Sequence, residues 1–218
     1  KGTAYTFNVT ATNAMGTSAP SLESDEIIPV DLAVGDFYQG GIVAYINKAG
    51  DDRYVSGKET GIIVAIEDND TIASWYTQRP DYIDYDVFFC LACVDIDNFI
   101  GAGQENTENI YNFYNNLEGT RISTSIFGII QSYNFDGYSD WYIPSLDELK
   151  TLYQNRVAIG NFDLEEEYWS SNDYYQEIFV DGVRTPAPLR AKTLNFNTGL
   201  EEDRLKNREA KFRAIRYF

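Results

Sequence analysis

The hydrophobic pattern divides the chain into two unequal parts. Residues 3–11 alternate apolar and polar side chains with a period of two, the tetrapeptide Asn13-Ala14-Met15-Gly16 is typical of a turn, and a second extended run reaches Pro29. We therefore predict a β-hairpin over residues 1–29, a linker over 30–34 and a main domain over 35–218. An isolated hairpin is marginal in water, so we expect its partner strands in upstream domains of a longer protein.

The main domain begins with short apolar runs bounded by turn residues. Residues 42–46 and 61–66 are continuous apolar stretches, which predict buried strands, and residues 73–76 predict a third short strand. The pair Gly40-Gly41 before the first run indicates a bend or a close backbone approach. A polar loop is expected over residues 47–60.

Helical spacing replaces these runs in the middle of the chain. Apolar side chains recur at helical intervals over residues 104–117 and again over 120–133, which predicts two amphipathic helices. A third helix should begin at Ser145, because Ser145 and Glu148 have the spacing of a capping box. Its buried stripe would consist of Leu146, Leu149, Leu152 and Tyr153. After Phe162 the pattern returns to strands, and we expect the last strand, 212–218, to pair with an early one.

Composition limits the classes of partner. The 218 residues include 17 basic and 34 acidic side chains, which give a formal net charge of -17. This balance disfavours nucleic-acid phosphates and anionic membrane surfaces, both of which require lysine and arginine patches. The chain has no run of about 18 apolar residues, so we predict no membrane insertion. With 44% hydrophobic residues, a sizeable core is expected.

Catalytic chemistry is scarce in the sequence. The chain has no histidine, so a Ser-His or Cys-His nucleophile pair is impossible, and it has no glycine-rich phosphate loop. We predict that it is not an enzyme and needs no cofactor, although its many carboxylates leave an acid pair for glycoside hydrolysis open. Zinc would need two ligands beyond Cys90 and Cys93, so we interpret both cysteines as buried small hydrophobes.

Two acidic loops are candidates for a hard cation. They are residues 51–52 (Asp-Asp) and 68–70 (Asp-Asn-Asp), and oxygen ligands of this kind suit Ca²⁺. We interpret them as solvated turns and predict no metal site.

Three blocks in fixed order carry a family resemblance. They are residues 137–149 (Gly-Tyr-Ser-Asp-Trp-Tyr-Ile-Pro-Ser-Leu-Asp-Glu-Leu), 168–171 (Tyr-Trp-Ser-Ser) and 213–218 (Arg-Ala-Ile-Arg-Tyr-Phe). Together they resemble the C-terminal recognition domain of bacterial collagen-like adhesins and of phage and archaeal-virus surface proteins, including the variable proteins of diversity-generating retroelements. Residues 1–29 similarly resemble the last hairpin of a fibronectin type III domain, with Tyr5 as its corner tyrosine.

The resemblance implies an α+β, C-type-lectin-like fold and a function. It implies a variable receptor-binding protein on a virion surface or outside the cell, whose partner is a host-surface protein or glycan. Trp141 and Trp169 would build the core, and Asp140 would bond the backbone at a turn. The alternative function is an invariant bacterial surface lectin that binds glycans, and an enzyme ranks third.

The binding face implied by the resemblance is residues 172–208. Residues 200–211 are rich in helix formers, but the resemblance implies loop and strand there. Lys192 departs from the family, which usually has tryptophan at this place. Adenine-directed mutagenesis of asparagine codons cannot produce Gln176, Glu177, Lys192, Glu201, Glu202 or Lys206. It can produce the following residues, which we predict to form the variable ligand-binding face: Asn172, Asp173, Tyr174, Tyr175, Arg184, Arg190, Leu194, Asn197, Leu200, Asp203, Arg204, Asn207 and Arg208.

Overall fold

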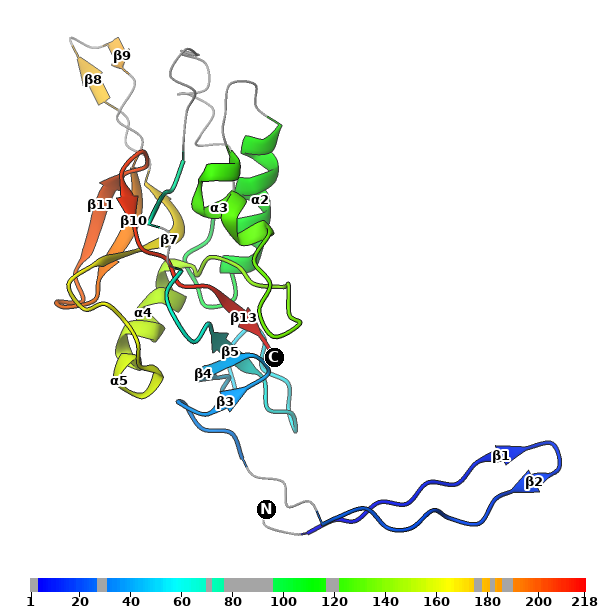
Figure 1. Cartoon of the computed structure of the whole chain (residues 1–218). Helices are drawn as coiled ribbons and strands as arrows, with labels where there is room; N and C mark the ends of the chain where they lie inside the picture. Colours follow the sequence, from blue (N-terminus) through cyan, green and yellow to red (C-terminus); the bar gives the residue numbers. More distant parts are fainter. Residues whose placement is uncertain are drawn as a thin grey trace. The chain divides into compact units, whose positions relative to one another are not determined.

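The computed structural model describes residues 4–26, 31–69, 72–76, 96–116, 122–174, 178–180, 183–185 and 190–218. The chain forms two compact units, Lys1–Ala33 and Val34–Phe218, which are coloured along the sequence in Figure 1.

The first unit is a hairpin, as its alternating pattern predicts. Strands β1 (Thr12–Asn13) and β2 (Gly16–Thr17) flank the expected turn, in which the Asn13 side chain accepts a hydrogen bond from the Met15 amide at 2.8 Å. Backbone hydrogen bonds continue the pairing to Phe7, whose carbonyl accepts from the Ser24 amide. Phe7 is exposed, so the apolar side of this hairpin gains nothing from burial. The likeness to a fibronectin hairpin stays a prediction.

The second unit contains a four-stranded antiparallel sheet with the strand order β13–β5–β4–β3. Its strands are β3 (Phe37–Tyr38), β4 (Gly41–Ile46), β5 (Gly61–Val64) and β13 (Ile215–Tyr217). The pairing of Ile215 with Val64 confirms that the last strand joins an early one. Gly41 makes the expected close approach, because a Cβ there would lie 2.4 Å from the Val64 carbonyl oxygen.

A three-stranded antiparallel sheet has the order β11–β10–β7. Its strands are β7 (Glu167–Tyr174), β10 (Arg190–Asn195) and β11 (Glu201–Leu205). Two smaller pairs accompany it: β6 (Ala73–Ser74) with β12 (Glu209–Ala210), and β8 (Ile178–Val180) with β9 (Val183–Thr185). The segment rich in helix formers is therefore extended, as the resemblance implied, because cross-strand pairing overrides local propensity.

The helices of the described residues lie between 103 and 159. They are α2 (Gly103–Asn115), the 3-10 turn η2 (Ile122–Thr124), α3 (Ile126–Gln131), α4 (Leu146–Gln154) and α5 (Arg156–Ile159). The capping box of α4 is confirmed: the Ser145 hydroxyl accepts from the Glu148 amide, and the Glu148 carboxylate accepts from the Ser145 amide at 2.7 Å. The helix expected over 120–133 is shorter than predicted, because Ser125 caps a new helix at Ile126. No helix in the described part of the chain is long and apolar enough to cross a bilayer.

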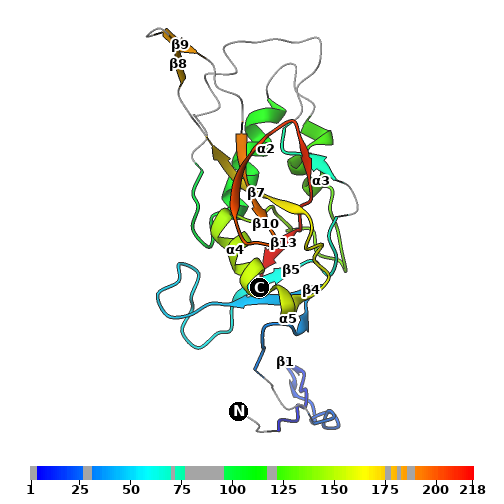
Figure 2. The same cartoon turned by 90° about the vertical axis from the view of Figure 1, so that its left-hand side faces the viewer.

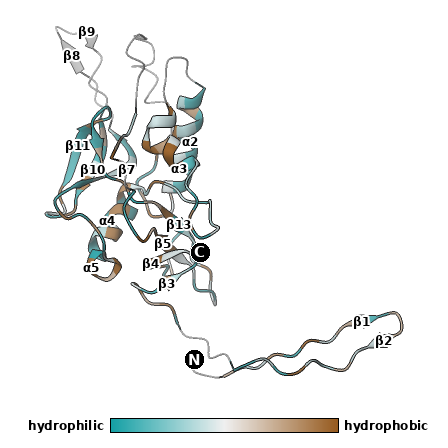
Figure 3. Cartoon of the chain, viewed as in Figure 1, coloured by the Kyte–Doolittle hydropathy of each residue, from teal (hydrophilic) through white to brown (hydrophobic). Residues whose placement is uncertain are grey.

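Two hydrophobic clusters join these elements. One contains Trp75, Trp141 and Trp169, and the other contains Tyr168 and Phe196. Helix α4 contacts β4, β7 and β10, so it links the two larger sheets, while α2 contacts β7 and α3 (Figure 2). Brown, apolar stretches of α3 and α4 alternate with polar stretches in Figure 3, which is the amphipathic pattern of helices packed on a core. The unit is mixed α+β, as predicted.

Candidate functional site

The predicted binding face is divided between the two ends of one sheet. Because β7, β10 and β11 are antiparallel neighbours, Tyr174, Arg190 and Leu205 lie side by side at one end. Asn197 and Leu200 belong to the turn between β10 and β11 at the other end, about 15 Å away at the usual rise per strand residue. The predicted residues therefore do not form one surface.

The first end carries paired charges. We call it the charged end and define it as Tyr174, Arg190, Lys192 and Asp203, all of which are partly exposed. The predicted site residue Asp173 is opposite the buried Ala191 and therefore faces the other side of the sheet. Lys192 and Asp203 are directly opposite each other across β10 and β11, and their side chains form an ion pair at 2.5 Å. The Lys192 ammonium also lies 4.7 Å from the centre of the Tyr174 ring. These contacts hold donors, acceptors and an aromatic ring together at one place.

A buried lysine supports the charged end from below. The Lys206 ammonium forms an ion pair with Asp173 at 2.7 Å and lies 4.0 Å from the centre of the Trp75 ring. Burial lowers the pKa of Lys206 to about 8, against the opposing attraction of Asp173. The next two residues, Asn207 and Arg208, are exposed, so they extend the surface beside the charged end.

Two residues predicted for the binding face are instead structural. Asn172 is 2% exposed, and its amide group accepts from the Leu146 amide and donates to the Asp97 carbonyl at 2.8 Å. Leu194 is 1% exposed and belongs to the cluster around Tyr168. The prediction that Asn172 and Leu194 face a ligand is wrong, because both side chains hold β7 and β10 against the rest of the domain.

Arg204 is partly exposed but already engaged. Its guanidinium donates to the Glu167 carboxylate at 2.9 Å and to the Glu209 carbonyl at 2.8 Å. At the far end of the sheet, Asn197 and Leu200 are exposed. The prediction for Tyr175 and for the side chain of Arg184 falls outside the described residues, as does that for Cys90 and Cys93.

The scaffold residues occupy the places that the resemblance implied. Trp141 and Trp169 are buried, and their indole nitrogens donate to the carbonyls of Tyr138 and Ala73. Asp140 differs from expectation, since its main partner is the Arg216 guanidinium and not a backbone turn. The core thus fixes the strands that carry the charged end.

The acidic loops have structural partners. Asp51 accepts from the Tyr45 hydroxyl at 2.8 Å and from the Lys48 amide at 2.7 Å, which orders a turn. The sequence predicts a solvated turn at Asp68, but the Asp68 side chain is 10% exposed and pairs with Lys211 and Arg213 at 3.6 Å each. Within the ranges that the structure describes, no three acidic or thiol side chains gather as metal ligands.

Sequence reasoning missed Lys192 and Lys206 as members of this region. A signal for Lys192 was present in the sequence, because residues 195–199 (Asn-Phe-Asn-Thr-Gly) are typical of a turn. In the structure the Asn195 carboxamide oxygen accepts from the Asn197 and Thr198 amides within this turn. Counting outward from that turn places Lys192 opposite Asp203. No comparable local signal marks Lys206, which meets Asp173 only through the tertiary fold.

No protein-family model matches the sequence, and comparison with curated proteins gave no significant match. The lectin-like likeness and the kinship to variable proteins stay predictions from the three sequence blocks.

Proposed function

We propose that this chain is a binding protein of a virion or cell surface, and that it attaches to a host-surface protein through the charged end. On this proposal the C-type-lectin-like domain is a rigid scaffold. Tyr174, Arg190, Lys192 and Asp203 touch the partner, and Asn207 and Arg208 contribute from the adjoining turn. The proposed activity is recognition and involves no chemical step.

The observation that carries the proposal is the combination of side chains at the charged end. Tyrosine and arginine are enriched at the energetic centres of protein interfaces, and charged groups at the rim give specificity and faster association. The Lys192–Asp203 pair fixes one such rim contact before a partner arrives. Preorganisation of this kind lowers the ordering cost of binding.

Packing in the core also fixes the strand that carries part of the charged end. Trp169 is fully buried on the same strand that ends in Tyr174. Residues on strands that are locked by packing hold a binding constellation more accurately than residues on free loops. Such a scaffold tolerates replacement of the exposed side chains, which is the property that a diversified receptor-binding protein requires.

A pair of surface-display libraries tests the proposal without knowledge of the natural partner. One library randomises Tyr174, Arg190, Asp203, Asn207 and Arg208, and each variant is scored for folded display and for binding to lysozyme as a model protein target. We expect most members to fold and some to bind.

The matched library randomises the buried neighbours Asn172, Thr193 and Leu194, and we expect most of its members to be lost from folded display. Equal loss of folding in both libraries would contradict the proposal. A genomic search gives a second test: a near-identical downstream repeat that differs at adenines and adjoins a reverse transcriptase would support natural diversification.

A further inference from the structure

A lysine and an aspartate meet in the interior next to the charged end. The Lys206 side chain is 1% exposed and the Asp173 side chain 17% exposed, and Nζ lies 2.7 Å from Oδ2. Because Oδ2 is bonded to Cγ, Nζ lies within about 4 Å of the carboxyl carbon. An amine attacks a carbonyl carbon from about 3 to 3.5 Å, so a shift of less than about 1 Å brings the two atoms to reacting distance.

The main chain on both sides of this contact is fixed by backbone pairing. Asp173 lies in β7, opposite Ala191 of β10. Lys206 directly follows β11, and its carbonyl accepts from the Tyr76 amide at 3.0 Å. Strands β7 and β11 are the outer strands of the three-stranded sheet, with β10 between them. The two side chains therefore come from separate strands and meet without any change in the backbone.

Aromatic rings surround the lysine. The Lys206 ammonium lies 4.0 Å from the centre of the Trp75 ring, and the Tyr114 ring packs edge-on against Trp75 and tilted against Tyr76. Trp75 and Tyr114 are both 1% exposed, so little water reaches the amine. This burial lowers the pKa of Lys206 to about 8. Removal of a lysine from water in this way favours the neutral amine, which is the nucleophilic form.

The charged form of the pair is poorly satisfied. An ammonium has three N–H donors. Among the described residues, the ion pair of Lys206 with Asp173 is not aligned as a hydrogen bond, and no other acceptor engages Nζ. Burial of two opposite charges is costly unless good hydrogen bonds satisfy them. An amide formed from the two side chains would carry no charge, so it would remove this cost.

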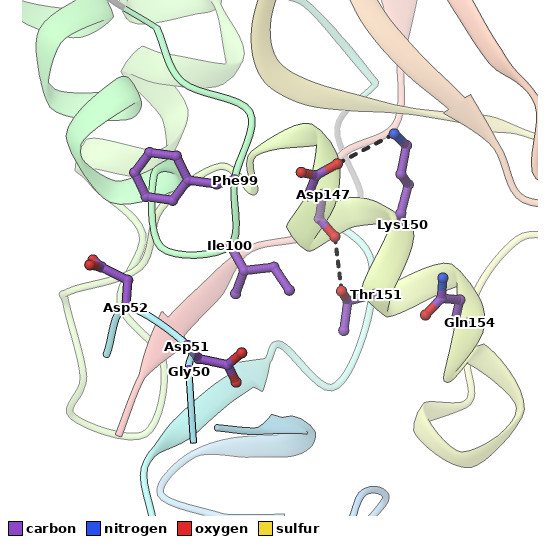
Figure 4. A pocket seen from close by; sticks show the side chains of 9 residues that line it. All are labelled: Gly50, Asp51, Asp52, Phe99, Ile100, Asp147, Lys150, Thr151 and Gln154. Carbon is purple, nitrogen blue, oxygen red and sulfur yellow. Dashed lines mark hydrogen bonds and ion pairs between the residues drawn. The ribbon is translucent and has the colours of Figure 1, made fainter. Parts of the chain in front are cut away.

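In other lysine–carboxylate pairs of the described residues, the lysine is more exposed. The Lys192 side chain, which pairs with Asp203, is 24% exposed. Figure 4 shows another such pair, Lys150 with Asp147 on α4 at 3.3 Å, in which the lysine is 35% exposed. Water solvates these ammonium groups and keeps them protonated. The Lys192–Asp203 pair joins the same residue types in the same sheet and is therefore the matched comparison for the buried pair.

We propose that Lys206 and Asp173 condense to an isopeptide bond. A proton passes from Nζ to the carboxylate, the neutral Nζ attacks Cγ, and a C–O bond breaks as the N–C bond forms. The oxygen leaves as one water molecule with the carboxyl proton and one proton from the amine. The two side chains are the only reactants, and their fixed proximity replaces a high concentration of amine. The partly exposed side of Asp173 gives the released water a way out.

The bond would connect the two outer strands of the sheet. It would link β7 to the segment after β11 and enclose β10 in a covalent loop, which restricts the unfolded chain in the way that a disulfide does. Tyr174 follows Asp173 and Asn207 follows Lys206, so the bond would brace the proposed binding surface at two places. It forms with or without a partner, so it is independent of the proposed function. Titration of the Lys206 amine belongs to the chain in which this bond has not formed.

Mass spectrometry of the full 218-residue chain tests the proposal after the folded protein is incubated at neutral pH. We expect the denatured chain to be lighter than its sequence by one water molecule. Trypsin cleaves after a lysine only when its amine is free, so the peptide that contains Asp173 should stay attached to an uncleaved peptide that contains Lys206. Lys206→Arg and Asp173→Ala should restore the full mass. Lys192→Arg is the matched control and should keep the loss of water, and wild type held in urea throughout should show none.

Three results would overturn the isopeptide proposal. They are the full sequence mass in the folded wild type, loss of water that persists in Lys206→Arg, and loss of water located elsewhere in the chain. The exposed turn at Asp136 and Gly137 is one such place, because an Asp-Gly succinimide has the same mass. The wild-type measurement requires no substitution, so the test stays valid if Asp173→Ala fails to fold.

Discussion

Arg216 and Asp140 form a two-bonded ion pair between the last strand and the segment before α4. The Arg216 Nε donates to Asp140 Oδ1 at 2.7 Å, and Nη2 donates to Oδ2 at 3.0 Å. The same guanidinium lies 3.9 Å from the centre of the Tyr138 ring. Two of the three sequence blocks, 137–149 and 213–218, are therefore connected directly through their side chains.

This pair predicts a loss of stability in acid. The hydrogen bonds from Arg216 lower the pKa of Asp140 below its usual value, so the pair stabilises the fold above about pH 4 and loses its effect as the pH falls through the lowered pKa. Asp140→Asn should cost about 1 kcal/mol at pH 7, a value reduced because Asp140 is half exposed.

Urea unfolding of the wild type and of Asp140→Asn measures this effect. The pH should run from about 2 to about 7, which includes the range over which a carboxylate titrates. The difference in unfolding free energy should shrink toward the acid end. A constant difference would mean that Asp140 acts through packing and not through its charge. Glu165→Gln, with an exposed side chain, is the control and should stay within about 0.5 kcal/mol.

Lys206 should change the unfolding free energy at neutral to alkaline pH, whereas Asp140 changes it in acid. Its folded pKa of about 8 lies below its ordinary value of 10.5 because the ammonium is buried. A depressed amine pKa destabilises the fold at neutral pH, and this cost declines as the pH rises through the folded pKa toward the unfolded one. The wild type should therefore gain stability relative to Lys206→Met between about pH 7 and pH 10. Chemical unfolding at several pH values checks this, and a flat difference would show that Lys206 titrates normally.

A buried and an exposed asparagine should differ in their contribution to stability. Asn172→Ala leaves the Leu146 amide without its partner and removes one of the two donors to the Asp97 carbonyl, which keeps its bond from the Asn106 amide group. We therefore expect a cost of about 1 to 3 kcal/mol. The exposed Asn207→Ala should cost under about 0.5 kcal/mol. Thermal unfolding of the two variants compares them directly, and similar melting temperatures would argue against the division.

A buried and an exposed apolar residue should also differ in their contribution to stability. Trp169→Ala removes a fully buried ring and its bond to the Ala73 carbonyl, at a cost of about 3 to 5 kcal/mol. Leu200 is 62% exposed, so Leu200→Ala should change stability by less than about 0.5 kcal/mol. Equal destabilisation in calorimetry would mean that the turn at Leu200 belongs to the core.

The sequence predicted the features that depend on few neighbouring residues. The capping box at Ser145 and Glu148, the turn after Asn13 and the buried strand at Ile62 all follow from local spacing, and all three are present. The same reasoning failed at Asn172. The sequence pattern predicts an exposed polar residue at this position, but the partners of Asn172 are Leu146 and Asp97, which are distant in the sequence.

The sequence by itself predicted a mixture of helices and strands and the burial of Trp141 and Trp169, but not every boundary, since the helix expected over 120–133 begins at Ile126. These are set by local periodicity and by the apolar area that large side chains must bury. Only the tertiary structure decided which side chains share a surface. Antiparallel pairing brings Tyr174, Arg190 and Asp203 together and sends Leu200 to the far end of the sheet. Strand order and register depend on contacts between segments distant in the chain, and no local pattern contains them.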